Sequence, residues 1–301
     1  MNHLLKEEAK KHGDRVQIIS IEHLADLKEE LEDFKNSEEL NGFQQWIVND
    51  LYHFEIPDTD FEVKSIILMA IYHPFSADIE LDYQGKTYHT RSIVMSDFDN
   101  AKRYLSEFLS QHHYHAFEVD NLPMKRLAVQ SGLAVYGRNN ITYVEELGSN
   151  ILYIAFFTDI PCEKDEWRKL CVADLCSKCN KCINLCPTGA IQKDRFLIDN
   201  QKCLSYINEG GGEFPDWLSK EVHHTLYDCL RCQEKCPLNK SVSKDTIGPI
   251  RFTEEETRML LDDKGPEDFS DKFMEKANTI GLFKWSNGLS RNIKTIIETQ
   301  D

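Results

Sequence analysis

The sequence predicts an α+β fold in which a mixed domain precedes a cysteine-rich module and a short helical tail. The apolar run from Ser65 to Tyr72 is eight residues long and rich in β-branched side chains, which predicts a buried central strand. Amphipathic stretches before and after this run predict helices that cover it. Eight of the ten cysteines lie between Cys176 and Cys236. We therefore expect divisions at 1–160, 161–245 and 246–301.

The other elements follow from periodicity and from turn residues. A hairpin is expected over 78–94, with its turn at Gln84–Gly85. The strands expected over 141–144 and 150–157 should pair through the turn at 147–149. Gly265–Pro266 should break the helical tail. The spacing predicts further strands at 16–21 and 116–119, and helices at 3–12, 23–35, 41–54, 100–112 and 124–131.

Composition limits the classes of function. The 301 residues carry a net charge of −16 and show no block of Lys and Arg, so DNA is an unlikely partner and the odds of any polynucleotide substrate are lower. The longest apolar run is too short to cross a membrane, and the N-terminus has no apolar signal region. We therefore expect a cytoplasmic protein without membrane contact. In that compartment ten cysteines favour metal binding over disulfides.

The cysteine motif begins at Cys176 and reads C-S-K-C-N-K-C-I-N-L-C-P to Pro187. This spacing is typical of bacterial ferredoxins, in which three cysteines hold one [4Fe–4S] cluster and the fourth ligates a second cluster. Structural zinc bound by paired C-x-x-C knuckles, or buried thiols, are the alternatives. The proline after the last cysteine favours two clusters.

A second motif, D-C-L-R-C-Q-E-K-C-P, lacks its first cysteine, and Leu226 stands at that position. Cys203 is the only cysteine between the two motifs, so we assign it as the missing ligand. Cys162 and Cys171 remain as ordinary thiols. The pairing rule gives one cluster to Cys176, Cys179, Cys182 and Cys236, and the other to Cys186, Cys203, Cys229 and Cys232.

Several polar residues are candidates for a site next to the clusters. Asp120 follows a predicted strand and precedes a helix, where a helix cap is the simpler explanation. Arg138 and Asn139 lie in the loop G-L-A-V-Y-G-R-N-N, which is either a ligand-facing loop or a surface turn. Ser205 and Tyr206 directly follow Cys203, so they should lie close to a cluster.

The histidines at 112, 113 and 115 invite comparison with a metal site. They gather at a predicted helix end, where polar and cationic residues are common. We favour that simpler explanation, and we treat His223 and His224 in the same way.

Taken together, these motifs resemble the epoxyqueuosine reductase family. The resemblance covers roughly residues 60–240, and the lone Cys203 followed by Ser–Tyr is its most specific part. In order along the chain, the matching segments are Val119–Asp120 with Pro123, Gly132–Leu133 with Gly137–Arg138, Cys176 to Ala190, Cys203 to Tyr206, and Asp228 to Pro237.

The resemblance implies a nitroreductase-like catalytic domain, a ferredoxin-like module with two [4Fe–4S] clusters, and cobalamin bound base-off without a histidine ligand. It implies that Asp120 is the proton donor, with a pKa raised by burial beside the corrin. Arg138 and Asn139 would face the cofactor, and Ser205 and Tyr206 would lie beside the cluster and the corrin. An external low-potential donor would supply electrons.

The namesake enzyme reduces an epoxide during queuosine biosynthesis, a form of tRNA processing. Here the segment T-R-S-I-V-M-S-D-F-D-N departs from the family pattern, and the tail is shorter than the helical-repeat tails of family members that act on tRNA. The substrate is therefore either a tRNA nucleoside or a smaller molecule. The alternative is an iron–sulfur electron-transfer protein that binds no corrin and serves a protein partner.

Overall fold

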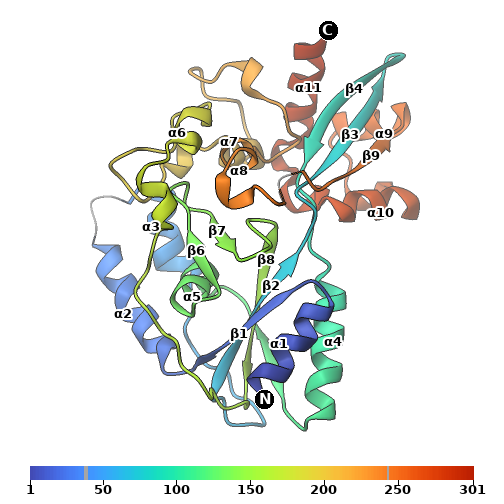
Figure 1. The fold of residues 1–301 in the computed structure, drawn as a ribbon. Helices are drawn as coiled ribbons and strands as arrows, with labels where there is room; N and C mark the ends of the chain where they lie inside the picture. Colours follow the sequence, from blue (N-terminus) through green and yellow to red (C-terminus); the bar gives the residue numbers. More distant parts are fainter. Residues whose placement is uncertain (37–39, 243) are drawn as a thin grey trace. The chain divides into compact units, whose positions relative to one another are not determined.

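The structure is a computed structural model that describes residues 1–36, 40–242 and 244–301. Two compact units make up the chain (Figure 1). Unit 1 comprises residues 1–73 and 96–179, and unit 2 comprises residues 74–95 and 180–301. Each unit is therefore built from two separate stretches of sequence.

Unit 1 contains an antiparallel sheet with the strand order β1-β2-β8-β5. Its two central strands, β2 (Ser65–Tyr72) and β8 (Ile151–Thr158), pair along their whole length with Ile67 opposite Phe156. The edge strands are β1 (Arg15–Ser20) and β5 (Ala116–Val119). The central strands are apolar at successive positions because both faces of the sheet are covered.

Helices α1 (Asn2–Lys11) and α4 (Phe98–Gln111) cover one face of this sheet. Their buried side chains share a core with the odd-numbered residues of β2, and the even-numbered residues face the opposite side. Helix α5 (Met124–Gln130) packs against β2 and β8. Helix α2 (His23–Lys35), which has the predicted bounds, buries an apolar stripe of Leu24, Leu27 and Leu31.

Two sequence expectations for unit 1 need correction. The helix expected over 41–54 is α3 (Gly42–Trp46) followed by a π-helix (Ile47–Leu51). The expected pairing of the strands at 141–144 and 150–157 is wrong: β7 (Thr142–Val144) pairs with β6 (Ala134–Tyr136) instead. Strand β8 lies in the sheet centre because its apolar side chains need cover on both faces.

Unit 2 is built on a three-stranded sheet with the order β4-β3-β9. Strands β3 (Ser76–Tyr83) and β4 (Lys86–Ser92) form the predicted hairpin, and positive φ angles at Gln84 and Gly85 make the two-residue turn that such hairpins favour. Strand β9 (Thr246–Phe252) pairs in parallel with β3 and was not predicted. Four of its seven residues are exposed, and two of these, Gly248 and Pro249, are adjacent, so the sequence lacks the regular alternation of a strand.

Three helices of the tail complete the core of unit 2: α9 (Glu254–Leu261), α10 (Asp271–Thr279) and α11 (Leu289–Gln300). The cysteine motifs lie on shorter helices, namely α6 (Lys181–Leu185), α7 (Leu204–Glu209) and α8 (Arg231–Glu234). Short 3-10 helices occur at Asp174–Ser177, Asn200–Lys202, Lys220–Val222, Pro237–Asn239, Pro266–Asp268 and Leu282–Gly288.

The expected division at 160 and 245 remains a prediction, while the compact units follow a different division. The hairpin at 76–92 belongs with the C-terminal helices because Ile79, Leu81 and Tyr88 share their core. Within the described ranges, no helix is both long enough and apolar enough to span a bilayer.

Candidate site around the cysteine motifs

Three of the four cysteines assigned to the second cluster lie near one another in unit 2. Cys186 and Cys203 are close enough to Cys229 to act on its ionisation, and burial together with these neighbours raises the pKa of the Cys229 thiol to about 12. Burial also raises the pKa of Cys203. Buried thiolates need compensating positive charge, which iron supplies. The donor set therefore fits an iron–sulfur cluster.

Helix α7 places Cys203 at its N-cap. The Cys203 side chain makes no capping hydrogen bond, but the nearby backbone N–H groups of Ser205 and Tyr206 favour its thiolate and partly oppose the effect of burial on its pKa. The side chains of Ser205 and Tyr206 are half-buried in the first turn of the same helix. Ser205 and Tyr206 therefore lie close to the predicted ligand Cys203, because the first turn of α7 folds back beside its N-cap residue.

The four ligands predicted for the first cluster come from both motifs. Cys182 lies in α6 and Cys236 follows α8, and these two helices pack against each other within unit 2. Cys176 lies in a 3-10 turn at the end of unit 1, close along the chain to Cys179. All four are half-buried.

The loop after β6, together with β6 itself, forms hydrogen bonds with residues 171–176, which lead into the first cysteine motif. Arg138 donates a hydrogen bond to the carbonyl oxygen of Cys176. Tyr136 donates to the Cys171 carbonyl at 3.1 Å and accepts from the Ala173 N–H at 2.8 Å, so residues 171–173 extend β6 in parallel. The segment that sequence analysis treated as a ligand loop or surface turn therefore supports the first cysteine motif.

Asn139 is buried in this loop, with 3% of its surface exposed. Its Nδ2 donates to the Tyr143 hydroxyl at 2.9 Å. Gly137 fits beneath both side chains, because a Cβ there would meet Asn139 Oδ1 at 2.5 Å and the Tyr143 ring at 2.6 Å. Asn139 thus has an internal bonding role, and its contact with a cofactor stays a prediction.

Asp120 lies between β5 and α5 in a loop where Asn121 adopts a left-handed conformation with φ 60°. The Asn121 carbonyl accepts from the His53 N–H at 3.1 Å. The Asp120 carboxyl itself is exposed, so the burial expected for a proton donor is not seen in this conformation of the chain.

The sequence did not predict a buried polar network between α11 and the segments next to Cys203 and Cys229. Asn292 of α11 donates to the Asn208 carbonyl at 2.8 Å and to the Leu226 carbonyl at 2.7 Å. Arg291 donates to the Ile207 and Gly210 carbonyls and lies over the ring of Phe214. The tail helix therefore holds the segments that follow Cys203 and precede Cys229. In the sequence, the one indication of this network is Asn292 itself, a polar residue within the apolar stripe of a predicted helix.

One buried and one half-buried carboxyl group accompany this network. Asp228 accepts from the Ile93 N–H at 2.7 Å, and burial raises its pKa to about 7. Burial and the nearby Asp228 raise the pKa of Glu209 to about 8. Asp228 directly precedes Cys229, so this hydrogen bond connects the second cysteine motif to the end of the β3–β4 hairpin.

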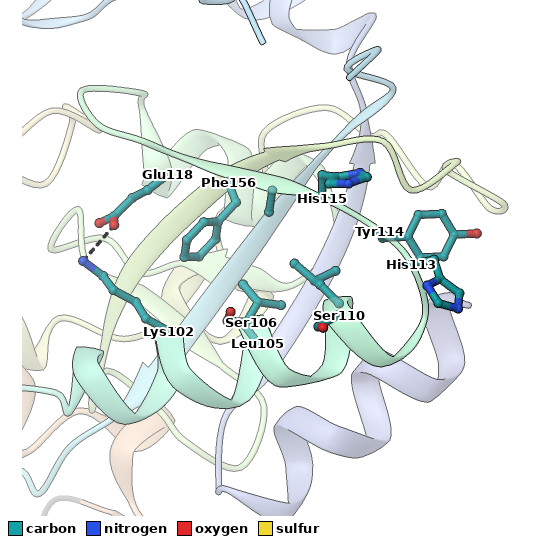
Figure 2. Close-up of a pocket in the computed structure, with 11 residues that line it drawn as sticks. Lys102, Leu105, Ser106, Ser110, His113, Tyr114, His115, Glu118 and Phe156 are labelled. Atoms are coloured by element: carbon teal, nitrogen blue, oxygen red, sulfur yellow. Dashed lines mark ion pairs between the residues drawn. The ribbon is translucent and has the colours of Figure 1, made fainter. Parts of the chain in front are cut away.

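A groove of unit 1 lies away from the cysteine motifs. It has a volume of about 760 Å³ and lies between α4 and β5, with Phe156 at its floor and the Lys102–Glu118 ion pair at one end (Figure 2). None of the predicted cluster or cofactor residues lines it. His113 and His115 lie on its rim, and His115 pairs with Asp159 at 2.8 Å. In the described chain, no three His, Cys, Asp or Glu side chains are arranged around a single metal ion.

Comparisons with known proteins cover this region well. The family described as "4Fe-4S double cluster binding domain" matches residues 175–239. The epoxyqueuosine reductase of Bacillus subtilis is 30% identical over 161 residues, which cover 52% of this chain and 39% of that protein. The epoxyqueuosine reductase of Cellulophaga algicola is 27% identical over 244 residues, covering 77% of this chain and 76% of that protein. The chain thus spans about two-fifths of the Bacillus relative.

Solved structures show the same fold. A Bacillus subtilis epoxyqueuosine reductase, described with its catalytic aspartate loop swung out of the active site, has a TM-score of 0.61 at 21% identity and covers 99% of this chain and 82% of its own. An epoxyqueuosine reductase bound to an epoxyqueuosine-modified tRNA stem loop has a TM-score of 0.58 at 20% identity, with the same coverage. The resemblance to the epoxyqueuosine reductases that the motifs predict is therefore confirmed, together with a double [4Fe–4S] cluster domain in an α+β fold.

Proposed function

We propose that this chain is an oxidoreductase of the epoxyqueuosine reductase type, in which two [4Fe–4S] clusters deliver electrons to cobalamin for the reduction of an epoxide-type substrate. The observation that carries the proposal is the grouping of Cys186, Cys203 and Cys229, with Ser205 and Tyr206 directly after Cys203 in the first turn of α7. This arrangement supports electron transfer from the second cluster to a cofactor bound beside the first turn of α7.

Cobalamin supplies a low-valent cobalt centre able to reduce a carbon–oxygen bond. The residues that would hold it are Arg138, Ser205 and Tyr206, which present donors of the kind a corrin periphery requires. The Asn139 amide already donates a hydrogen bond to Tyr143, so its contribution would be to fix the shape of the loop that faces the cofactor. Ser205 and Tyr206 fit best, since both side chains are partly exposed beside a predicted cluster ligand.

Asp120 would hold the proton that the reduced substrate takes up. Its position in an exposed loop is compatible with this role if the loop closes when substrate binds, as catalytic loops commonly do. The solved relative whose catalytic aspartate loop is swung out provides a parallel. Closure would bring the carboxyl to the bound substrate, within the hydrogen-bond reach that a general acid needs.

The proposed substrate is an epoxide-bearing nucleoside in a tRNA stem loop, by analogy with the relative solved in that complex. A smaller epoxide is the alternative because the net charge of −16 opposes binding to a long polyanion. We place the protein in the reducing cytoplasm, where its cysteines stay available to iron.

A second candidate function is an electron-transfer protein without a corrin. The internal bonds of Arg138 and Asn139 favour it, because both side chains already have partners within unit 1. Under this alternative the two clusters would remain, and cobalt would be absent.

The deciding experiment is a metal count on protein purified without oxygen. After reconstitution with iron, sulfide and hydroxocobalamin and removal of excess, we expect about eight irons and one cobalt per chain. About eight irons without cobalt would exclude the reductase proposal under those conditions and favour the second candidate. Fewer than about four irons would contradict both.

A further inference from the structure

The charge of the chain is distributed unevenly around the cluster domain. Residues 175–239 carry eight Lys or Arg and eight Asp or Glu, so the whole net charge of −16 lies outside them. Within the domain the two cysteine motifs differ from the connecting segment. Residues 176–187 and 229–240 together carry five Lys or Arg and a single carboxylate, Glu234.

Glu234 does not offset this local positive charge, because it pairs with Arg91 of β4 at 3.2 Å. Three lysines near the ligands of one cluster remain exposed: Lys181 directly before Cys182, Lys235 directly before Cys236, and Lys240 after the following 3-10 turn. None of the three forms an ion pair with the residues that the structure describes.

An exposed apolar residue accompanies these lysines. Leu185 is 36% exposed and lies four residues after Lys181 on α6, so both side chains are on one side of that helix. Helix α6 packs against α8, which brings the residues before Cys182 and Cys236 to the same part of unit 2. We name Lys181, Leu185, Lys235 and Lys240 the lysine face.

We propose that the lysine face is the docking surface for an acidic, low-potential electron-carrier protein such as a flavodoxin. The proposal rests on the two clusters of the proposed function and adds the entry point for electrons. The predicted ligands of the two clusters differ in burial: Cys229 of the second cluster is buried, whereas all four ligands of the first are half-buried. Two of those four, Cys182 and Cys236, directly follow Lys181 and Lys235 of the lysine face.

The chemistry needs no bond making. One electron leaves the reduced carrier, which is oxidised by one electron, and enters the oxidised first cluster, which is reduced by one electron. A positive patch with a small apolar centre suits a transient complex of this kind, because opposite charges steer encounter without demanding tight binding. The remainder of the chain is acidic and would repel an acidic carrier, so productive encounters would concentrate on the lysine face.

The test uses the full chain with both clusters reconstituted. Reduced flavodoxin is mixed with the oxidised protein without oxygen, and loss of cluster absorbance gives a second-order rate constant. We expect the Lys181→Glu/Lys235→Glu variant to lower this constant about tenfold at low ionic strength, and most of the difference to vanish in about 0.5 M salt. Lys181→Gln/Lys235→Gln should give an intermediate decrease.

Three controls separate docking from other effects. Iron content must match the wild type, and the methyl viologen radical cation must reduce the Glu variant at least as fast, because that reductant is positive. Lys264→Glu/Lys272→Glu makes the same change in net charge at exposed lysines of the tail and should keep the flavodoxin rate within about twofold.

The proposal is overturned if the Lys181/Lys235 variants retain the wild-type flavodoxin rate, or if the tail variant slows reduction equally. A loss of tRNA stem-loop binding with an unchanged flavodoxin rate would also overturn it and assign the lysine face to RNA. If the wild-type protein held no clusters, methyl viologen would cause no loss of cluster absorbance. That result would refute the proposed function rather than the docking proposal.

Discussion

At the scale of single residues, Cys203 combines sequence and structural reasons for a ligand role. It is the one cysteine between the motifs, it caps α7, and it lies near Cys186 and Cys229. Cys162, by contrast, directs its thiol to the backbone carbonyls of Ile18 and Lys164 at 3.6 Å. One thiol thus faces other thiols, and the other bonds only to backbone.

Replacing Cys203 should therefore remove one cluster. We expect Cys203→Ala to bind about four irons per chain where the wild type binds about eight, measured by iron analysis after anaerobic reconstitution. Cys162→Ala is the matched control and should keep the full iron content. Equal iron in the wild type and in Cys203→Ala would show that the ligand assignment is wrong.

Asp120 is the residue whose role depends most on movement. We expect Asp120→Asn to lower turnover of an epoxyqueuosine-bearing tRNA stem loop by about 10²- to 10⁴-fold, because the amide cannot donate a proton, while iron and cobalt stay unchanged. Asp99→Asn changes an exposed carboxylate of the α4 N-terminus and should have little effect. Normal turnover by Asp120→Asn would exclude it as the acid.

Asp14 gives unit 1 a pH dependence. Its carboxyl accepts from the Tyr72 N–H at 2.9 Å and from the Tyr104 hydroxyl at 2.8 Å, and burial raises its pKa from 3.8 to about 6. A raised pKa means that the folded chain binds this proton more tightly than the unfolded chain. Its contribution to stability is therefore complete below pH 4 and falls as the pH rises to about 6.

The variant Asp14→Asn should flatten this dependence. Asparagine can accept from the Tyr72 N–H and donate to the Tyr104 hydroxyl, so both bonds survive. Relative to the wild type, we expect the variant to gain up to about 3 kcal/mol of unfolding free energy between pH 4 and pH 7, measured by urea unfolding. If the difference in unfolding free energy between the variant and the wild type stayed constant between pH 4 and pH 7, Asp14 would not be the source of the pH dependence.

At the scale of elements, α11 is an integral part of the cluster-binding unit. Its apolar side chains, including Ile293 and Ile296, fill the core of unit 2. Its buried Asn292 satisfies two carbonyls, one at the end of α7 and one shortly before Cys229. The helix thereby fixes the spacing between two predicted ligand segments that are far apart in sequence.

Asn292→Asp should disrupt this arrangement. The carboxylate would have no amide hydrogen to donate and would face two carbonyl oxygens in a buried site, at a cost of at least about 2 kcal/mol. We expect a lower thermal midpoint and faster loss of iron to a chelator. Lys294→Asp introduces an acid at an exposed position of the same helix and should retain iron at the wild-type rate.

At the scale of the whole molecule, each unit draws on two segments of the chain, and the hairpin β3–β4 belongs to unit 2. Residues 174–301 contain every predicted cluster ligand, but in isolation β9 would lose its parallel partner β3. Phe252 and Leu226 would lose the apolar cover of Ile79 and Leu81.

A fragment of residues 174–301 should therefore fail to unfold cooperatively in urea and should bind iron poorly. Fusing residues 74–95 to it through a flexible Gly/Ser linker should restore both properties, because the hairpin can then pair with β9. Cooperative unfolding of the fragment without the hairpin would refute the division into these two units.

Prediction from sequence succeeded where the physical cause is local. The cysteine spacing from Cys176 to Cys236 predicts the double-cluster domain found over residues 175–239, and the turn residues Gln84 and Gly85 predict the hairpin turn, in which both have positive φ angles. Strand β2 and helix α2 have the predicted bounds because their periodicity reports burial directly.

Tertiary structure decided the features that depend on distant partners. Strand β9 becomes a strand through pairing with β3, and β8 lies between β2 and β5 because both of its faces can be covered only there. The internal bonds of Asn139 and Asn292 likewise depend on which carbonyls and hydroxyls the fold brings to them. Local spacing specifies which side chains can bind iron, whereas long-range packing specifies which segments present them together.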